Sequence, residues 1–191
     1  MESQTFVPKG LHHQIVALEA IHVPIPTFTL PAPYTHTYTE YHTTSRDETP
    51  ERIKDATVVI CTVVGLDAEM LDPKVSPNLQ FIAVMASGTD HIDLEAARRR
   101  NIRVCNCPSA NIDSVSQHAI SLYFAARKSV VKMHNSVVDG VGEWKAKGSV
   151  TYKMRDGEGK PPLTCGEEVI GILGYGALGK RKQNRPTHTT H

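Results

Sequence analysis

The chain has 191 residues, of which 40% are hydrophobic and 21% charged, as in an ordinary soluble globular protein. Its formal net charge of +1 gives no electrostatic reason to expect a nucleic acid or an anionic membrane as partner. No apolar run approaches the roughly 18 residues of a membrane span, and the first residues lack the pattern of a secretory signal. We therefore expect a cytoplasmic protein.

Apolar runs alternate with turns and short helical patterns through the first half of the chain. Strands are predicted at residues 15–18, 34–41, 56–62, 79–85 and 102–105. Helical segments are predicted between them, as a short helix at 50–54, a single turn at 66–71 and a helix at 93–100. Four prolines between Pro24 and Pro33 predict a loop. This alternation is typical of a parallel α/β sheet.

The second half of the chain begins with a helical pattern. Apolar residues recur at helical spacing from 112 to 128, and residues 130–138 can form a second helix. Residues 139–164, rich in glycine, lysine and proline, predict a long connection. An apolar, β-branched run at 169–173 predicts one more strand.

The four cysteines are Cys61, Cys105, Cys107 and Cys165. Cys61 and Cys105 lie in strand-like runs, where a reduced cysteine behaves as a small hydrophobic residue. Cys105 and Cys107 would form a zinc site only with further ligands at regular spacing, which the sequence does not offer. We therefore expect no metal site.

A glycine-rich turn follows the last predicted strand and has the spacing of a dinucleotide-binding fingerprint. Gly174 permits the tight turn, Gly176 lets the backbone approach a pyrophosphate, and Gly179 lets the following helix pack closely. The anion would lie on N–H groups at the start of that helix. The alternative is a plain strand-to-helix turn with incidental glycines. The residues of the candidate cofactor site are Gly174, Tyr175, Gly176, Ala177, Leu178 and Gly179.

The glycine turn lies close to the end of the chain, because His191 is only 12 residues beyond Gly179. In the fingerprint, the residue that reads the ribose lies roughly 20 residues further on. The sequence therefore makes no choice between NAD and NADP, and it predicts an incomplete nucleotide-binding domain. Residues 181–191 are basic and interrupted by proline, which predicts a disordered tail.

Three stretches resemble the D-isomer-specific 2-hydroxyacid dehydrogenases, most closely their fungal glycerate-dehydrogenase-like members. They are residues 81–93 (FIAVMASGTDHID), 102–118 (IRVCNCPSANIDSVSQH) and 169–180 (VIGILGYGALGK), within a resemblance that runs from about Gln14 to Lys180. Together these stretches are far more specific than the glycine spacing alone. The early end of the chain makes us expect a C-terminally truncated member.

The resemblance implies a division of the chain into domains. Residues 1–107 would form a flavodoxin-like parallel-sheet substrate domain. Residues 108–180 would be the incomplete start of a Rossmann NAD(P)-binding domain, and 181–191 a tail outside the family. The helices at 112–138 would contribute to a dimer.

The resemblance also implies site residues. Ala86, Ser87 and Gly88 match a loop whose backbone amides hold the substrate carboxylate, although a simple tight turn is the alternative reading. Val115 lies where the family's helix approaches the nicotinamide. Gln117 stands where the family often has a glutamate, so a polar contact there is altered.

The catalytic arginine, glutamate and histidine of the family lie beyond the glycine turn, so no residue of this chain matches them. His91, His118 and His134 are not substitutes, because a lone histidine is more often a structural residue with its hydrogen bonds satisfied. We therefore predict no catalytic residue within this chain.

The implied function is NAD- or NADP-dependent hydride transfer to or from a small 2-hydroxy or 2-oxo acid such as glycerate or hydroxypyruvate, with the isolated chain impaired. One alternative is a non-catalytic relative that forms a homodimer, or a heterodimer with a full-length family member. Another alternative is a simple α/β ligand-binding module.

Overall fold

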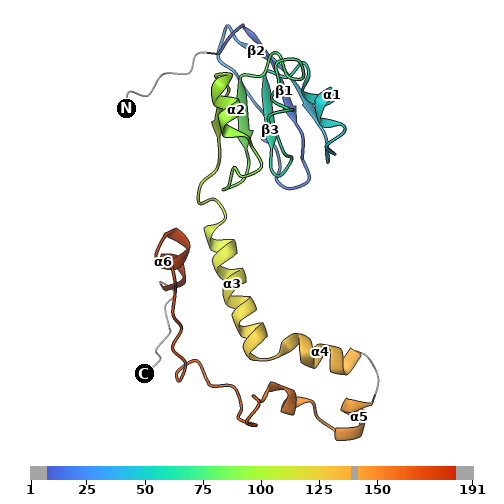
Figure 1. Ribbon diagram of the computed structural model, residues 1–191, viewed down its shortest axis with the longest axis vertical. Coiled ribbons are helices and arrows are strands. Elements are labelled where there is room, and N and C mark those ends of the chain that lie inside the picture. Colours follow the sequence, from blue (N-terminus) through green and yellow to red (C-terminus); the bar gives the residue numbers. More distant parts are fainter. Residues whose placement is uncertain (1–7, 139–141, 184–191) are drawn as a thin grey trace. The chain divides into compact units, whose positions relative to one another are not determined.

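A computed structural model describes residues 8–138 and 142–183 of the chain. The chain divides into two units, Met1–Ala110 and Asn111–His191 (Figure 1). Within the described residues, no helix combines the length and the apolar character that a membrane span requires.

Five parallel strands form one sheet in the first unit, in the order β2-β1-β3-β4-β5 (Figure 1). The strands are β1 (His12–Ala17), β2 (Thr35–Glu40), β3 (Val58–Cys61), β4 (Phe81–Val84) and β5 (Arg103–Cys105). All five predicted strands are present, and the predicted parallel α/β class is confirmed. In register, Cys61 lies beside Val84, so β3 and β4 end side by side at the carboxyl edge of the sheet.

Two short helices accompany this sheet, α1 (Thr49–Ile53) and α2 (Leu94–Arg99). Asp93 begins α2 because its side chain accepts a hydrogen bond of 2.8 Å from the amide of Ala96. The helical turn expected at 66–71 is present as a single turn, in which the amide of Leu71 donates to the carbonyl of Asp67 at 2.9 Å. The predictions for all three segments are therefore confirmed.

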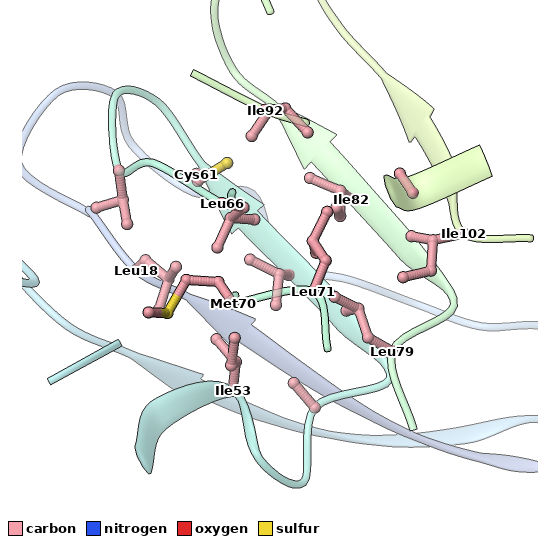
Figure 2. Packing of buried hydrophobic residues seen from close by; sticks show 14 of the residues in the cluster. Leu18, Ile53, Cys61, Leu66, Met70, Leu71, Leu79, Ile82, Ile92 and Ile102 are labelled. Atoms are coloured by element: carbon pink, nitrogen blue, oxygen red, sulfur yellow. The ribbon is translucent and has the colours of Figure 1, made fainter. Parts of the chain in front are cut away.

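The main hydrophobic core lies against one face of the sheet (Figure 2). Ile53 of α1, Leu66 of the connection after β3 and Ile82 of β4 are fully buried there. Burying a side chain of this size contributes about 1.5–3 kcal/mol, so these residues account for the packing of helices and connections onto the strands.

The opposite face has a smaller cluster formed by Ile15, Ala17 and Ile60. Ile25 and Phe28, from the proline-containing loop between β1 and β2, pack against it. A parallel sheet is normally covered on both faces, and here a loop provides part of the second cover in place of a helix.

The second unit is helical. Its elements are α3 (Ile112–Arg127), α4 (Val130–Val138), α5 (Glu143–Lys147), the 3₁₀ helix η1 (Thr151–Met154) and α6 (Ala177–Gln183). The predicted helices at 112–128 and 130–138 are confirmed. The connection expected at 139–164 is more ordered than predicted because it contains α5 and η1, while residues 139–141 lie outside the described part of the chain.

The strand predicted at 169–173 is wrong, because the structure has no strand there. Val169 and Leu173 have relative exposures of 99% and 103%. A strand is held by hydrogen bonds to a neighbouring strand, and the described residues of this unit include none. The tail prediction is wrong for residues 181–183, which continue α6, and residues 184–191 lie outside the described residues.

Candidate functional site

The predicted substrate loop, Ala86–Ser87–Gly88, follows β4 directly and is tied to the segment that follows β5. The side-chain amide of Asn106 donates to the Ser87 carbonyl at 2.8 Å. The backbone amide of Cys107 donates to the Ala86 carbonyl at 3.0 Å, and the Ser87 hydroxyl donates to the Cys107 carbonyl at 3.3 Å. These bonds hold the loop at the carboxyl edge of the sheet, where open α/β folds bind their ligands.

Gly88 completes this loop and is exposed. Its amide has no hydrogen-bond partner among the described residues, so the donor is available to an anion. A Cβ added at Gly88 would lie 3.2 Å from Oδ2 of Asp90. The loop therefore offers a backbone donor at a position where a side chain would crowd its neighbour. Its assignment to a substrate carboxylate stays a prediction.

Glu19 lies two residues after the end of β1 and binds the neighbouring loop after β3. The sequence pattern did not predict this role. The Glu19 carboxylate accepts hydrogen bonds from the amides of Thr62, Val63 and Val64 at 2.9, 2.8 and 2.8 Å. Burial of Glu19 raises its pKa. The three hydrogen bonds and the nearby His22 lower the pKa by more than burial raises it, so the pKa lies below its usual value. The available signal was an acidic residue directly after an apolar strand run.

Two buried polar atoms near the carboxyl edge, Thr62 Oγ1 and His91 Nε2, have no hydrogen-bond partner among the described residues. The prediction that the lone histidines are satisfied is therefore wrong for the His91 side chain. Its carbonyl accepts the Leu66 amide at 2.9 Å, which fixes the backbone but leaves the ring nitrogen without a bond. His118 and His134 are exposed on α3 and α4.

The glycine turn of the second unit has the backbone geometry that its spacing suggested. Gly174 has a φ of +93°, which favours glycine. A Cβ on Gly179 would collide with the Gly174 carbonyl oxygen, whereas one on Gly176 would meet nothing within 4 Å. Helix α6 begins at Ala177, and the amide of Lys180 donates to the Gly176 carbonyl at 3.0 Å. This shape fits a pyrophosphate at Gly176, although the preceding strand is missing.

The segment before the turn is attached to α3 through Glu168. Its carboxylate accepts a hydrogen bond from the Tyr123 hydroxyl and forms an ion pair with Arg127. The hydrogen bond from Tyr123 is the main cause that keeps the pKa of Glu168 below its usual value. Glu168 thus positions the approach to the glycine turn, a role the sequence pattern did not reveal.

The remaining predicted residues are simple to locate. Val115 is exposed near the start of α3, and its amide donates to the Asn111 carbonyl at 2.9 Å. Gln117 is exposed on the same helix. Across the described ranges, no group of three or more histidine, cysteine or acidic residues could hold a metal ion.

One hollow of the first unit lies away from the candidate loop. It has a volume of about 810 Å³, and its lining includes Lys9 before β1, Gln80 before β4 and Arg103 at the start of β5. A smaller apolar hollow of about 300 Å³ includes Ile15 and Phe81. Neither of these two hollows includes Ala86–Gly88.

The strand order and the position of the loop define a class, the flavodoxin-like α/β proteins with ligand sites at the carboxyl ends of parallel strands. Residues 23–155 match the sequence profile of the D-isomer specific 2-hydroxyacid dehydrogenase, catalytic domain. The chain belongs to the D-isomer-specific 2-hydroxyacid dehydrogenase family, as its motifs suggested.

Individual relatives agree with this assignment. The chain is 34% identical over 148 residues to a glycerate dehydrogenase of Methylorubrum extorquens, covering 77% of this chain and 44% of that protein. It is 33% identical over 142 residues to a glyoxylate reductase of Pyrococcus furiosus, covering 71% and 38%. The chain thus spans less than half of these relatives.

Among solved structures, an NAD-dependent formate dehydrogenase of Staphylococcus aureus in complex with NAD is similar with a TM-score of 0.62. The identity is 22%, and the match covers 88% of this chain and 51% of that chain. At this identity the likeness supports the fold alone.

Proposed function

We propose that this chain forms the substrate-binding part of an oxidoreductase that transfers a hydride between a nicotinamide cofactor and C2 of a small 2-hydroxy or 2-oxo acid. The observation that carries the proposal is the Ala86–Gly88 loop, held by Asn106 and Cys107 at the carboxyl edge of a family-typical sheet. Relatives that include a glycerate dehydrogenase and a glyoxylate reductase favour glycerate, hydroxypyruvate or glyoxylate as the acid.

The loop would bind the acid through its carboxylate. A carboxylate bound to backbone N–H groups forms charge-assisted hydrogen bonds, which are roughly twice as strong as neutral ones. The unpaired amide of Gly88 supplies one such donor. The role of the first unit is therefore to hold the acid and orient C2.

The cofactor would be held by Gly174 to Gly179, with the pyrophosphate against Gly176, where no atom of the protein occupies the space of a side chain. Val115 would lie near the nicotinamide. When bound, the cofactor supplies or accepts the hydride. No described residue distinguishes NAD from NADP, and we propose no residue of this chain as the acid–base group.

We propose the substrate domain at 1–107 and the first part of the NAD(P)-binding domain at 108–180, with residues 181–191 outside the family's pattern. The division between Ala110 and Asn111 lies close to the first boundary and supports it.

A second candidate function is that of a dimerisation partner without catalysis. Large apolar side chains are exposed along α3 and α4, among them Leu122, Val131 and Val138. Apolar residues gathered on helices are typical of protein interfaces. We propose that the 112–138 helices bind a second copy or a full-length family member.

Calorimetric titration with glyoxylate, hydroxypyruvate, NADH and NADPH, followed by an absorbance assay of NADH oxidation, tests the proposal. Binding of an acid that weakens in a Gly88→Ala variant supports the role of the loop. Turnover would show that this chain holds a complete catalytic set, whereas acid binding without nicotinamide binding would favour a simple ligand-binding module. No binding of any acid would overturn the proposal. Sedimentation, alone and with a full-length relative, tests the dimerisation candidate.

A further inference from the structure

Two thiols without an assigned role lie next to the Ala86–Gly88 loop. Cys105 is the last residue of the edge strand β5, and both Cys105 and Cys107 are free and exposed. In register, Cys105 lies beside Ala83 of β4, so the pair follows the same edge of the sheet as the loop.

The backbone between and beyond these thiols holds the loop in place. Cys107 donates its amide to Ala86 at 3.0 Å and accepts the Ser87 hydroxyl at 3.3 Å. Asn106, between the two cysteines, donates its side chain to Ser87 at 2.8 Å. A movement of the 105–107 backbone therefore acts directly on Ala86 and Ser87.

Formation of a bond between the two sulfurs would favour such a movement. Residues two apart in an extended chain have Cα atoms about 6.6–6.8 Å apart. Disulfides accept up to about 6.8 Å but prefer about 5.5–6 Å. Closing the bond at the preferred separation would draw Cys107 towards Cys105 by up to about 1 Å, and this shift strains and weakens the hydrogen bonds that Cys107 makes to the loop.

We propose that Cys105 and Cys107 form a dithiol site for low-molecular-mass disulfides, whose reaction closes an internal Cys105–Cys107 disulfide and releases the Ala86–Gly88 loop. One cysteine thiolate attacks the external disulfide, forms a mixed disulfide and expels one external thiolate. The second cysteine attacks the protein sulfur of that mixed disulfide and expels the other external thiolate. Two protein thiols are oxidised, the external disulfide is reduced, and the two protons end on the expelled thiols.

The other two cysteines of the chain serve as internal controls. Burial, with a smaller effect of Glu19, raises the pKa of the Cys61 thiol to about 12, so Cys61 stays protonated and shielded. Cys165 is exposed but lies in the second unit, far along the chain from any other cysteine. Cys165 is therefore expected to stop at the mixed disulfide.

Treatment of the reduced full chain with glutathione disulfide, alkylation, trypsin digestion and mass spectrometry tests the proposal. Cys105 and Cys107 share the tryptic peptide Val104–Arg127, which holds no other cysteine. We expect this peptide to lose two hydrogens and to carry no glutathione. In Cys105→Ser and Cys107→Ser variants, the remaining cysteine should keep its glutathione, whereas a Cys165→Ser variant should close the disulfide as before.

Hydrogen exchange and amide chemical shifts report on the loop itself. After oxidation, the Cys107 amide should exchange about five- to tenfold faster, as expected for the loss of its hydrogen bond, and the signals of Ser87 and Gly88 should shift. Glutathione retained on both cysteines, or a closed disulfide with unchanged exchange and shifts, would overturn the proposal. These measurements do not depend on turnover, so their outcome is independent of whether the proposed function is correct.

Discussion

The carboxylate of Glu19 accepts a hydrogen bond of 2.8 Å from the backbone amide of Val64, a residue 45 positions further along the chain. With the amides of Thr62 and Val63, it joins the end of β1 to the loop after β3. A buried polar group left without its partner costs more than the bond itself contributes. The stability of the carboxyl edge of the sheet therefore depends on this one side chain.

Replacing Glu19 by glutamine should destabilise the first unit. The amides of Thr62 to Val64 all donate to one oxygen, Oε2, which the glutamine carbonyl can replace. The substitution removes the negative charge that strengthens these bonds, so we expect a loss of about 1–3 kcal/mol in the free energy of unfolding. Urea unfolding followed by far-UV circular dichroism measures it. The exposed Glu51, exchanged in the same way, is the control; equal effects of the two substitutions would contradict the role of Glu19.

The same carboxylate predicts an acid-sensitive fold. Because the pKa of Glu19 in the folded protein lies below its usual value, the stability that its carboxylate contributes is complete above the unfolded pKa. That contribution disappears as the pH falls through the folded pKa. As the pH falls below the unfolded pKa, the unfolding midpoints of the unmodified chain should therefore decrease more steeply than those of Glu19→Gln. Parallel pH profiles of the two proteins would refute this assignment.

Removal of the Asp93 side chain should shorten or loosen α2. Asp93 accepts the Ala96 amide at 2.8 Å, and loss of such a cap costs typically about 1 kcal/mol. Thermal unfolding of Asp93→Ala measures the change. Glu95→Ala lies in the same first turn without the capping bond and should have a smaller effect.

The two later glycines of the turn should respond differently to alanine. Gly176→Ala should leave the free protein unchanged, because the added Cβ meets nothing. It should weaken nicotinamide binding more than about tenfold, because the added methyl group would occupy the space proposed for the pyrophosphate and move it away from the backbone N–H groups. Gly179→Ala should disturb α6 without any cofactor, because its Cβ collides with Gly174, at a cost of about 1–3 kcal/mol. Calorimetry measures the loss of nicotinamide binding, and amide exchange of Lys180 measures the disturbance of α6, so together they distinguish the two variants. A disturbed α6 in the cofactor-free Gly176→Ala variant would contradict the described geometry of the turn.

Amide exchange at residues 169–173 should be fast in the isolated chain. These residues form no strand and donate no backbone hydrogen bond within the described part of the protein. Hydrogen-exchange mass spectrometry should find protection there comparable to that of an exposed peptide. Strong protection, especially at high protein concentration, would show that the segment pairs with another chain.

The sequence was sufficient for the elements whose signals are local. The β-branched run at 56–62 predicts β3, and Asp93 before an acidic first turn predicts α2, because side-chain shape and capping act within a few residues. The loop at Ala86–Gly88 could be located from the sequence because a glycine follows a predicted strand. The hydrogen bonds from Asn106 and Cys107 could not be predicted from the sequence, because they join segments that the pairing of β4 and β5 brings together.

The segment at 169–173 shows the opposite case. Its apolar, β-branched composition is typical of a strand and was the only basis for predicting one. In the structure, however, Val169 and Leu173 are exposed. Strand propensity describes a fit to a sheet and does not provide the neighbouring strand. The sequence alone therefore determined the α/β class and the family motifs. The tertiary structure decided which amides Glu19 binds and whether 169–173 is a strand, because both depend on contacts between distant residues.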